Sequence, residues 1–431
     1  MQLKIDYPFA TLDKGVSNHT INRLFARDRA VHDWYRFVLS FPAHLVRDYL
    51  CRWGIVPGQR VLDPFCGTGS TLVEAKKLGI HSVGIEANPV VHFAAATKID
   101  WSPDPDELMR HARDVASAAQ QTPAGNVDEP LLTLPDAAMQ ILLTGCISPV
   151  PLHKVLALRH AIASQDDPRF ARHMRLAMAK TAVVTASNLR FGPEVGVSAT
   201  KKSDAPVIEK WLENVREMAG DLRHVSRVTA SESVVKSGDA RDPGAVIEPN
   251  SIDVVFTSPP YPNEKDYSRT TRLETVLLGF AEDKAQLQAI KRGLLRSNTR
   301  NVYKGDGDDR FVDDFPVVQK IASDIESRRV ELGKTSGFEK LYPKVTKLYF
   351  GGMARHLSEL RPLLRQGAHL GYVVGDQASY LRVMIRTGEI LGKIAQSLGY
   401  ELVGIDLFRT RLSTATGDML REEVVILRWN G

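Results

Sequence analysis

The pattern of apolar and polar positions along this chain predicts seven β-strands. Seven short apolar runs each have the length of a buried strand, and helical patterns lie between several of them. Such alternation is typical of an α/β fold with a mostly parallel sheet, and the last two runs predict an antiparallel hairpin at the C-terminal end. The predicted strands span residues 59–63, 81–86, 233–236, 252–256, 370–374, 401–407 and 423–427.

Helical patterns occupy the chain before the first strand and again between the second and third strands. Residues 22–53 have apolar positions at helical spacing, and Pro42 should kink or divide this segment. After residue 90 further helical patterns replace the α/β rhythm, with a linker expected at residues 116–130, which are rich in Ala, Gln, Pro and Gly. The other predicted helices span residues 71–78, 155–163, 170–185, 207–228, 355–364 and 390–398.

Two insertions therefore interrupt the predicted α/β core. We expect residues 1–100 to form N-terminal helices and the first half of the core, residues 101–230 a helical insertion that is a candidate region for recognising a nucleic acid, and residues 231–431 the second half of the core. The second half contains a basic insertion at about residues 280–345, in which residues 284–304 carry six cations and no acid.

Composition narrows the class of protein without indicating a function. Of the 431 residues, 43% are hydrophobic and 25% are charged, as in an ordinary soluble protein, and the net charge of +5 is compatible with a polyanionic partner. Cys51, Cys66 and Cys146 lie far apart, so we expect neither a disulfide framework nor a metal ion. No apolar run approaches the ~18 residues of a membrane helix, and the N-terminus lacks a signal-peptide core. We therefore expect a cytoplasmic protein with no membrane partner.

A glycine-rich turn follows the first predicted strand and opens a helix. Asp63 ends the strand, and Gly67 and Gly69 let the backbone approach a ligand closely, beside the unpaired N–H groups of the helix start. The dinucleotide fingerprint would need a small residue where Leu72 stands, and the phosphate-binding loop would need a Gly-Lys-Ser/Thr sequence that this turn lacks. An acid at the strand end suits a ligand ammonium group better than a phosphate.

A second acid completes this candidate ligand site. Glu86 ends the next predicted strand, about twenty residues after the glycine turn, which is the separation at which a carboxylate meets ribose hydroxyls in a βαβ unit. An acid for an amine, glycines for close approach and an acid for a ribose together indicate S-adenosylmethionine rather than NAD or ATP.

A proline-stiffened turn ends the fourth predicted strand. Thr257, Ser258, Pro259, Pro260 and Tyr261 follow the apolar run, and consecutive prolines cannot continue a central strand because each lacks a ladder donor. The turn places a hydroxyl, free carbonyls and an aromatic ring at the carboxyl end of a parallel strand, where open α/β sheets bind ligands. Alone it would be an ordinary surface corner, but after a cofactor turn and a ribose acid it is a candidate catalytic site.

These motifs resemble those of the amino-group DNA methyltransferases, which use S-adenosylmethionine to methylate the exocyclic amine of cytosine or adenine. The resemblance rests on residues 61–71, 84–89 and 257–261, and it extends through residues 266–279. It implies a seven-stranded Rossmann-like methyltransferase sheet, double-stranded DNA as partner, a cytoplasmic and nucleoid-associated location, and a restriction endonuclease as a candidate second partner. The helical insertion has no counterpart in the resemblance, and the oligomeric state stays open.

The resemblance also implies roles for individual residues. Ser258 Oγ and the Pro259 carbonyl would accept N–H bonds from the target amine, Pro260 would keep the turn rigid, and Tyr261 would stack on a base flipped out of the helix. The implied cofactor residues are Phe41, Pro42, Asp63, Phe65, Gly67, Gly69, Glu86 and Asp239. The candidate DNA contacts are Arg269, Arg272, Arg292, Arg296, Arg300 and Lys304.

Several alternatives stay open. A serine at the head of the four-residue motif is associated in the family with cytosine, so we favour cytosine N4, with adenine N6 as the alternative. Methylation of an RNA or protein amine is a further alternative, although those motifs usually begin with Asp or Asn. The alternative from another class is a catalytically silent subunit that binds nucleic acid, which the intact Asp63, Glu86 and Ser-Pro-Pro-Tyr turn argue against. Methylation at cytosine C5 would need a thiolate after a proline, and the chain has no Pro-Cys pair.

Overall fold

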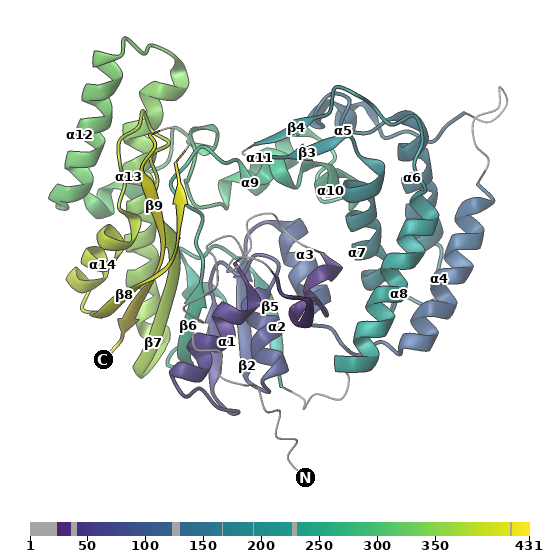
Figure 1. The fold of residues 1–431 in the computed structure, drawn as a ribbon, viewed down its shortest axis with the longest axis horizontal. Helices are drawn as coiled ribbons and strands as arrows, with labels where there is room; N and C mark the ends of the chain where they lie inside the picture. The colour runs from purple at the N-terminus through teal and green to yellow at the C-terminus, as the bar shows by residue number, and fades with distance from the viewer. Residues whose placement is uncertain are drawn as a thin grey trace.

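A seven-stranded sheet forms the centre of the computed structural model, which describes residues 24–35, 41–122, 130–165, 167–192, 194–225, 231–413 and 416–431. The strand order is β5-β2-β1-β6-β7-β9-β8 (Figure 1). Neighbours from β5 to β7 pair in parallel, whereas β9 lies antiparallel between β7 and β8. The strands are β1 (Arg60–Asp63), β2 (His81–Glu86), β5 (Ser233–Ser237), β6 (Ile252–Thr257), β7 (Leu364–Gly375), β8 (Glu401–Leu412) and β9 (Met419–Arg428).

This sheet confirms the predicted α/β fold class. Each of the seven predicted strands lies within a strand of the sheet or one residue outside it, and β8 and β9 form the predicted antiparallel hairpin. The run predicted at 370–374 is only the second half of β7, because Arg365 and Gln366 at its start are exposed and interrupt the apolar pattern. A short hairpin of β3 (Leu189–Phe191) and β4 (Val195–Val197) was not predicted.

Helices cover both faces of the sheet. Helices α1 and α2 pack on one face, against side chains that include Phe256, and α13 and α14 pack on the other face, against side chains that include Val255. Successive residues of a strand point to opposite faces, so β6 is apolar on both sides, as a central parallel strand must be. These four helices are α1 (Ala43–Arg52), α2 (Ser70–Lys77), α13 (Gly337–Leu360) and α14 (Thr387–Ser397).

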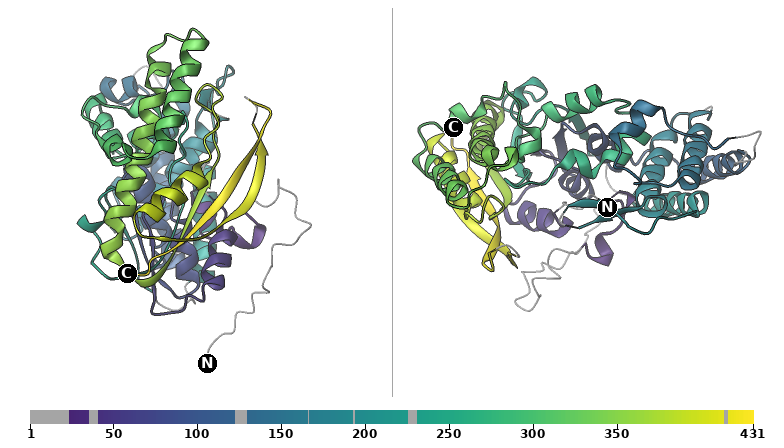
Figure 2. Two further views of the ribbon diagram at one scale, coloured as in Figure 1. Left: turned by 90° about the vertical axis from the view of Figure 1, so that its left-hand side faces the viewer. Right: turned by 90° about the horizontal axis from the view of Figure 1, so that it is seen from above.

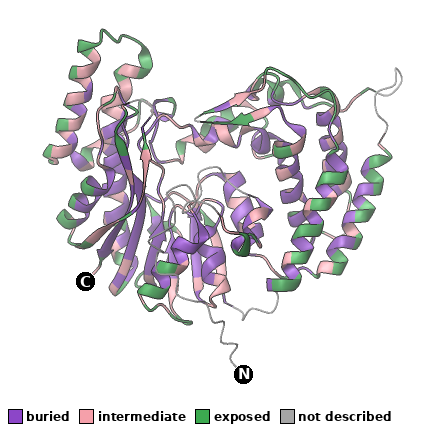
Figure 3. Cartoon of the chain, viewed as in Figure 1, coloured by how far each residue is buried: buried purple, intermediate pink, exposed green. Residues whose placement is uncertain are grey.

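A helical unit lies beside the sheet along the long axis of the molecule (Figure 2). Helices α4, α6, α7 and α8 pack around the buried Trp211, and the same apolar cluster reaches α3 and α10 next to the sheet. Each helix of the unit turns a buried side inward and an exposed side outward (Figure 3). The remaining helices are α3 (Pro89–Lys98), α4 (Pro105–Gln120), α5 (Asp136–Ile141), α6 (Pro149–Ala163), α7 (Ala171–Thr181), α8 (Val207–Val225), α9 (Tyr267–Thr270), α10 (Arg272–Leu277), α11 (Lys284–Arg292) and α12 (Pro316–Glu331).

Two predictions for the chain before β5 were wrong in part. Within residues 22–53 the described part before Pro42 has only the single turns Ala26–Asp28 and His32–Trp34, because Trp34 bonds to the distant Asp221 rather than packing along one helix. The linker was expected to begin at residue 116, but α4 continues as far as Gln120. Alanines between these two residues favour the helix, because alanine is the best helix former. Residues 123–129 lie outside the described residues. Within the described ranges, no helix is both long and apolar enough to cross a membrane.

Candidate active site

The turns that follow β1 and β6 line one cavity of about 710 Å³. The two strands are direct neighbours in the sheet, so their carboxyl ends lie side by side. The turns are also bonded to each other, since the Phe65 N–H donates to Thr257 Oγ1 at 3.3 Å and the Thr71 hydroxyl donates to the Phe256 carbonyl at 3.2 Å. The sheet thus brings the predicted cofactor turn and the predicted catalytic turn to one site.

Asp63 lies beneath the glycine turn and is fully buried. Its Oδ1 accepts hydrogen bonds from the Thr257 hydroxyl at 2.6 Å and from the Phe65 N–H at 3.2 Å. Its buried Oδ2 has no hydrogen-bond partner among the described residues. Burial raises the pKa of Asp63 to about 6. Asp63 therefore ties the two turns together and keeps one acceptor unused.

Glu86 lines the cavity and holds the glycine turn from the other side. Its Oε2 accepts the Gly67 N–H at 3.0 Å, and its Oε1 accepts the Asn88 N–H at 2.7 Å. Gly67 has φ 52° and Gly69 has φ 82°, left-handed conformations that favour glycine. Burial raises the pKa of Glu86 to about 7. Phe65 and Gly67 line the cavity beside Glu86.

The predicted catalytic turn lies at the cavity wall. Ser258 Oγ donates to the Val373 carbonyl at 3.0 Å, so its lone pairs face outward from that bond. Pro259 is buried, and Ser258, Pro259, Pro260 and Tyr261 all line the cavity. A Cβ at Gly375 of β7 would lie 2.9 Å from Tyr261 Cε2, which places the ring directly against the strand backbone. Burial raises the pKa of Tyr261, so its hydroxyl stays protonated.

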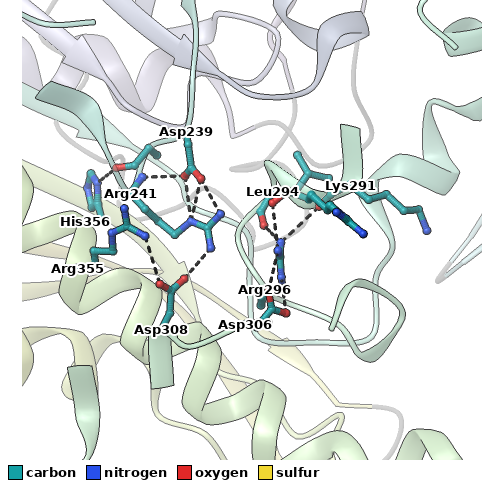
Figure 4. A network of polar contacts seen from close by, with 11 residues as sticks. Asp239, Arg241, Lys291, Leu294, Arg296, Asp306, Asp308, Arg355 and His356 are labelled. Atoms are coloured by element: carbon teal, nitrogen blue, oxygen red, sulfur yellow. Dashed lines mark hydrogen bonds and ion pairs between the residues drawn. The ribbon is translucent and has the colours of Figure 1, made fainter. Parts of the chain in front are cut away.

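Asp239 lies at another part of the cavity wall, in a network of ion pairs (Figure 4). Both of its carboxylate oxygens accept bonds from Arg241, the shortest at 2.6 Å. Arg241 also donates to Asp308 at 2.6 Å, and Arg355 approaches the same Asp308 at 3.4 Å. Asp239 is thereby tied to the basic insertion.

The two predicted N-terminal cofactor residues lie at the start of α1. Phe41 lines the cavity, and its ring meets Phe256 edge-on with 5.9 Å between ring centroids. Pro42 is the residue that precedes the first turn of α1 and directs the chain into that helix. The helix then packs on the sheet below the cavity, which places Phe41 at its rim.

The six candidate DNA contacts do not share one environment. Arg292, Arg300 and Lys304 are exposed, whereas Arg269 and Arg272 are half-buried, and Arg272 donates to the Ile141 carbonyl at 3.0 Å. Arg296 is only 4% exposed and is bonded to Asp306 at 2.8 Å, which does not fit the predicted contact with DNA. The charge run of the sequence could not reveal this burial.

Several cavity residues escaped the sequence analysis. Residues 293–295 of the basic insertion, Glu194 of the helical insertion and the pair Arg409 and Glu422 of the β8–β9 hairpin all line the cavity. Arg409 Nε donates to Glu422 at 2.6 Å, and Glu194 lies 3.5 Å from Arg300. These residues lie far from the motifs along the chain, and no local pattern marks them.

The chain has the seven-stranded, mostly parallel sheet that the resemblance to methyltransferases implies, and its glycine turn and Ser-Pro-Pro-Tyr turn line one cavity. Residues 12–96 match the family model described as DNA methylase, N6_N4_Mtase. The chain is 24% identical to the Type II methyltransferase M.BsoBI of Geobacillus stearothermophilus, over 93% of this chain and 85% of that protein. It is 21% identical to the Type II methyltransferase M.AvaI of Nostoc sp., over 95% of this chain and 87% of that protein. These matches confirm the predicted resemblance to the amino-group DNA methyltransferases.

Among solved structures, the rRNA methyltransferase aviRa from Streptomyces viridochromogenes is similar at 12% identity and a TM-score of 0.32, over 93% of this chain and 89% of that one. This likeness is too weak to bear on function.

Proposed function

We propose that this chain transfers a methyl group from S-adenosylmethionine to the N4 amine of a cytosine flipped out of double-stranded DNA. The observation that carries the proposal is the single cavity of about 710 Å³ that Ser258, Pro259, Pro260 and Tyr261 share with Gly67 and Glu86. The relation to Type II methyltransferases supports DNA as the substrate.

The donor groups present suit S-adenosylmethionine. The Glu86 carboxylate lines the cavity and can accept from ribose hydroxyls, because each of its oxygens keeps a lone pair beside the N–H bond that it receives. Asp63 has an unused buried acceptor beneath the turn. Gly67, which has no side chain, exposes its backbone to the cavity, and the Asp239 carboxylate lines the part of the cavity proposed to hold the adenine. When bound, the cofactor supplies an electrophilic methyl group on a sulfonium.

The catalytic turn is suited to making an amine nucleophilic. An exocyclic amine is a weak nucleophile because its lone pair is delocalised into the ring, and acceptors for its two N–H bonds favour a pyramidal nitrogen. Ser258 Oγ and the Pro259 carbonyl are such acceptors, and Pro260 keeps their separation rigid. The bound cofactor would supply the methyl group and keep the electron pair of the broken S–C bond on its sulfur, and the amine held by Ser258 Oγ and the Pro259 carbonyl would release one proton to solvent water as its N–C bond forms. Tyr261 offers its ring to the flipped base and recovers part of the unstacking cost.

Cytosine is favoured over adenine by the serine at the head of the turn. Adenine N6 is the second candidate, because the same pair of acceptors would bind its amine equally well. A purine would need more room against the ring of Tyr261 and the wall formed by Arg409 and Glu422.

The DNA partner is proposed to meet the exposed cations beside the cavity. Arg292, Arg300 and Lys304 are exposed on the basic insertion, where a phosphate backbone can pair with them. Residues 101–230 are proposed as a region of DNA recognition, since Glu194 of this insertion reaches the cavity rim. A restriction endonuclease is proposed as the second partner, by analogy with the Type II relatives.

The test is nucleoside mass spectrometry of DNA from a methylation-free host that expresses the chain. We expect N4-methylcytosine, with the Ser258→Ala variant as the control that lacks it. N6-methyladenine would replace the cytosine assignment by the adenine one. Binding of duplex DNA without methylation of any nucleic acid would contradict the enzyme assignment and support a silent subunit.

A further inference from the structure

We propose that residues 291–301 form the wall over the nucleoside end of the cofactor site, and that Arg296 is the positioning residue that holds this wall. The inference rests on the proposed use of S-adenosylmethionine. It assigns Arg296 a role on the cofactor side of the site, in place of the phosphate contact expected from its charge.

Within the described residues, every N–H of the Arg296 guanidinium has an acceptor. Nε and Nη2 donate to the two oxygens of Asp306 at 2.8 and 2.9 Å. Nη2 also donates to the Arg292 carbonyl at 3.1 Å, and Nη1 donates to the carbonyls of Lys291 and Leu294. A guanidinium has five N–H donors, so none remains for a phosphate.

The three carbonyl acceptors belong to the last turn of α11 and the residues that follow it. A cation at a helix C-terminus satisfies carbonyls that have no partner within the helix. Arg296 thus holds the backbone on both sides of Gly293, and Gly293 and Leu294 lie along the cavity wall. Leu295 also lines the cavity and packs against α13, where a Cβ at Gly352 would lie only 2.5 Å from Leu295 Cδ1.

The wall stands close to Glu86, and the insertion that contains it is tied to Asp239, the second acid expected to hold the nucleoside. A Cβ added at Gly293 would come within 3.8 Å of Ala87 Cβ, so the Gly293 backbone lies close to the residue that follows Glu86. At its far end the insertion reaches Asp239 through Arg241 and Asp308, with the Arg241–Asp308 bond at 2.6 Å. Figure 4 shows the two ion-pair groups, centred on Arg241 and Arg296, side by side.

The wall also provides an acceptor and a link to the catalytic turn. Asn301 is 2% exposed and lines the cavity, and its Oδ1 has no hydrogen-bond partner among the described residues. The Thr299 hydroxyl donates to Glu264 at 2.8 Å, and Asn298 Nδ2 donates to the Lys265 carbonyl at 3.1 Å. The segment that follows Tyr261 is therefore bonded to the same wall.

The test compares two charge-matched variants of one insertion, Arg296→Gln and Lys304→Gln. For Arg296→Gln we expect the Kd of S-adenosylhomocysteine, measured by calorimetry, to rise about tenfold or more, with the salt dependence of DNA binding unchanged. For Lys304→Gln we expect the Kd of S-adenosylhomocysteine to stay within about twofold, since this exposed side chain does not support the wall. An Arg296→Gln variant that binds S-adenosylhomocysteine normally and loses about one unit of salt slope would overturn the proposal in favour of a phosphate contact.

A second variant keeps the proposal testable if Arg296→Gln does not fold. Leu294→Ala preserves the carbonyl that Arg296 binds and trims only the side chain at the cavity, so we expect a Kd for S-adenosylhomocysteine raised about three- to tenfold with little change in Tm. An unchanged Kd for S-adenosylhomocysteine in Leu294→Ala would overturn the proposal that these residues form a wall of the cofactor site. If the unaltered chain itself failed to bind S-adenosylhomocysteine, the proposed function would fail, which is a different result from normal binding in the variants.

Discussion

At the scale of single residues, the hydroxyl hydrogen of Ser258 is already committed to the Val373 carbonyl at 3.0 Å. A hydroxyl has one donor and two acceptor lone pairs, so Ser258 Oγ can only accept from a further group. An amine, which brings N–H bonds, is such a group, whereas a carbonyl oxygen or a ring nitrogen without hydrogen is not. The hydrogen-bond direction at Ser258 thus agrees with an exocyclic amine as the target.

Pro259→Ala and Tyr261→Ala should each lower turnover far more than cofactor affinity. Pro259→Ala makes the backbone carbonyl that accepts from the amine less rigid, and Tyr261→Ala removes the ring proposed to stack on the base. We therefore expect kcat to fall about tenfold or more while the cofactor Kd stays within about twofold. Methyl transfer to DNA and calorimetry measure the two quantities. Asp63→Ala is the contrasting control and should weaken cofactor binding, because it unties the glycine turn from Thr257. Equal loss of cofactor affinity in all three variants would count against the assignment.

The residues that the sequence predicted best are those whose position follows from a strand end. Glu86 and Ser258 could be placed at one edge because parallel strands share their carboxyl ends, and both line the cavity. Arg296 could not be placed, because a run of cations carries no information about burial. Its partner Asp306 lies in a loop whose return to the insertion depends on tertiary contacts.

At the scale of elements, the close contact of the single turn Asp308–Val312 with α13 depends on a missing side chain. A Cβ at Gly351 of α13 would lie 1.9 Å from the Asp308 carbonyl oxygen. This would be a severe clash, and because the carbonyl belongs to the backbone, no side-chain rotation could relieve it. This contact holds Asp308 where it pairs with Arg241 at 2.6 Å, and thereby orients Asp239. A glycine in mid-helix costs helix stability, and here it provides close packing.

Gly351→Ala should therefore destabilise the protein in spite of the better helix propensity of alanine. We expect the free energy of unfolding to fall by about 2 kcal/mol or more, because the turn must move away from the helix. Gly220→Ala is the matched control, since this glycine also lies within a helix, α8, and an added Cβ would meet nothing within 4 Å. That variant should gain about 0.5–1 kcal/mol. Denaturant unfolding measures both changes, and a neutral Gly351→Ala would contradict the packing argument.

Element prediction succeeded for strands with continuous apolar runs and failed where tertiary contacts decide the conformation. The β3–β4 hairpin has only three residues in each strand, too few for a visible alternation. Its base is held by Asn188, which donates to the Gly145 carbonyl at 3.0 Å and to Ser148 Oγ at 3.1 Å. A hairpin held by hydrogen bonds to a segment about forty residues earlier leaves no periodic signal in its own sequence.

At the scale of the whole molecule, the N-terminal segment joins the helical unit to the second half of the core. The Trp34 indole donates to Asp221 of α8 at 2.8 Å, and the Tyr35 hydroxyl donates to Glu274 of α10 at 2.5 Å. Glu274 is 2% exposed, and its second oxygen has no hydrogen-bond partner among the described residues. Burial raises the pKa of Glu274 to about 7.

This acid should make the stability of the molecule depend on pH. The unperturbed pKa of a glutamate is ~4.3. Between that pH and about 7 the folded state therefore holds a proton on Glu274 that the unfolded state has released. The stabilisation is fully present below the unfolded pKa and is lost as the pH rises through the folded pKa. We expect the wild-type chain to lose about 3 kcal/mol more than Glu274→Gln between pH 5 and pH 8, by denaturant unfolding. The exposed Glu282→Gln is the control, and a wild-type pH profile parallel to that of Glu274→Gln would contradict the prediction.

The ring of Tyr261 rests on bare backbone at Gly375, and this has a consequence for judging related chains. Any larger residue at that position would displace the ring from this contact, because a Cβ would lie 2.9 Å from Tyr261 Cε2. A relative could then keep all four letters of the Ser-Pro-Pro-Tyr turn and still be inactive, owing to a change on a different strand. Whether a relative retains glycine at the end of this neighbouring strand is therefore as informative as whether it retains the motif itself.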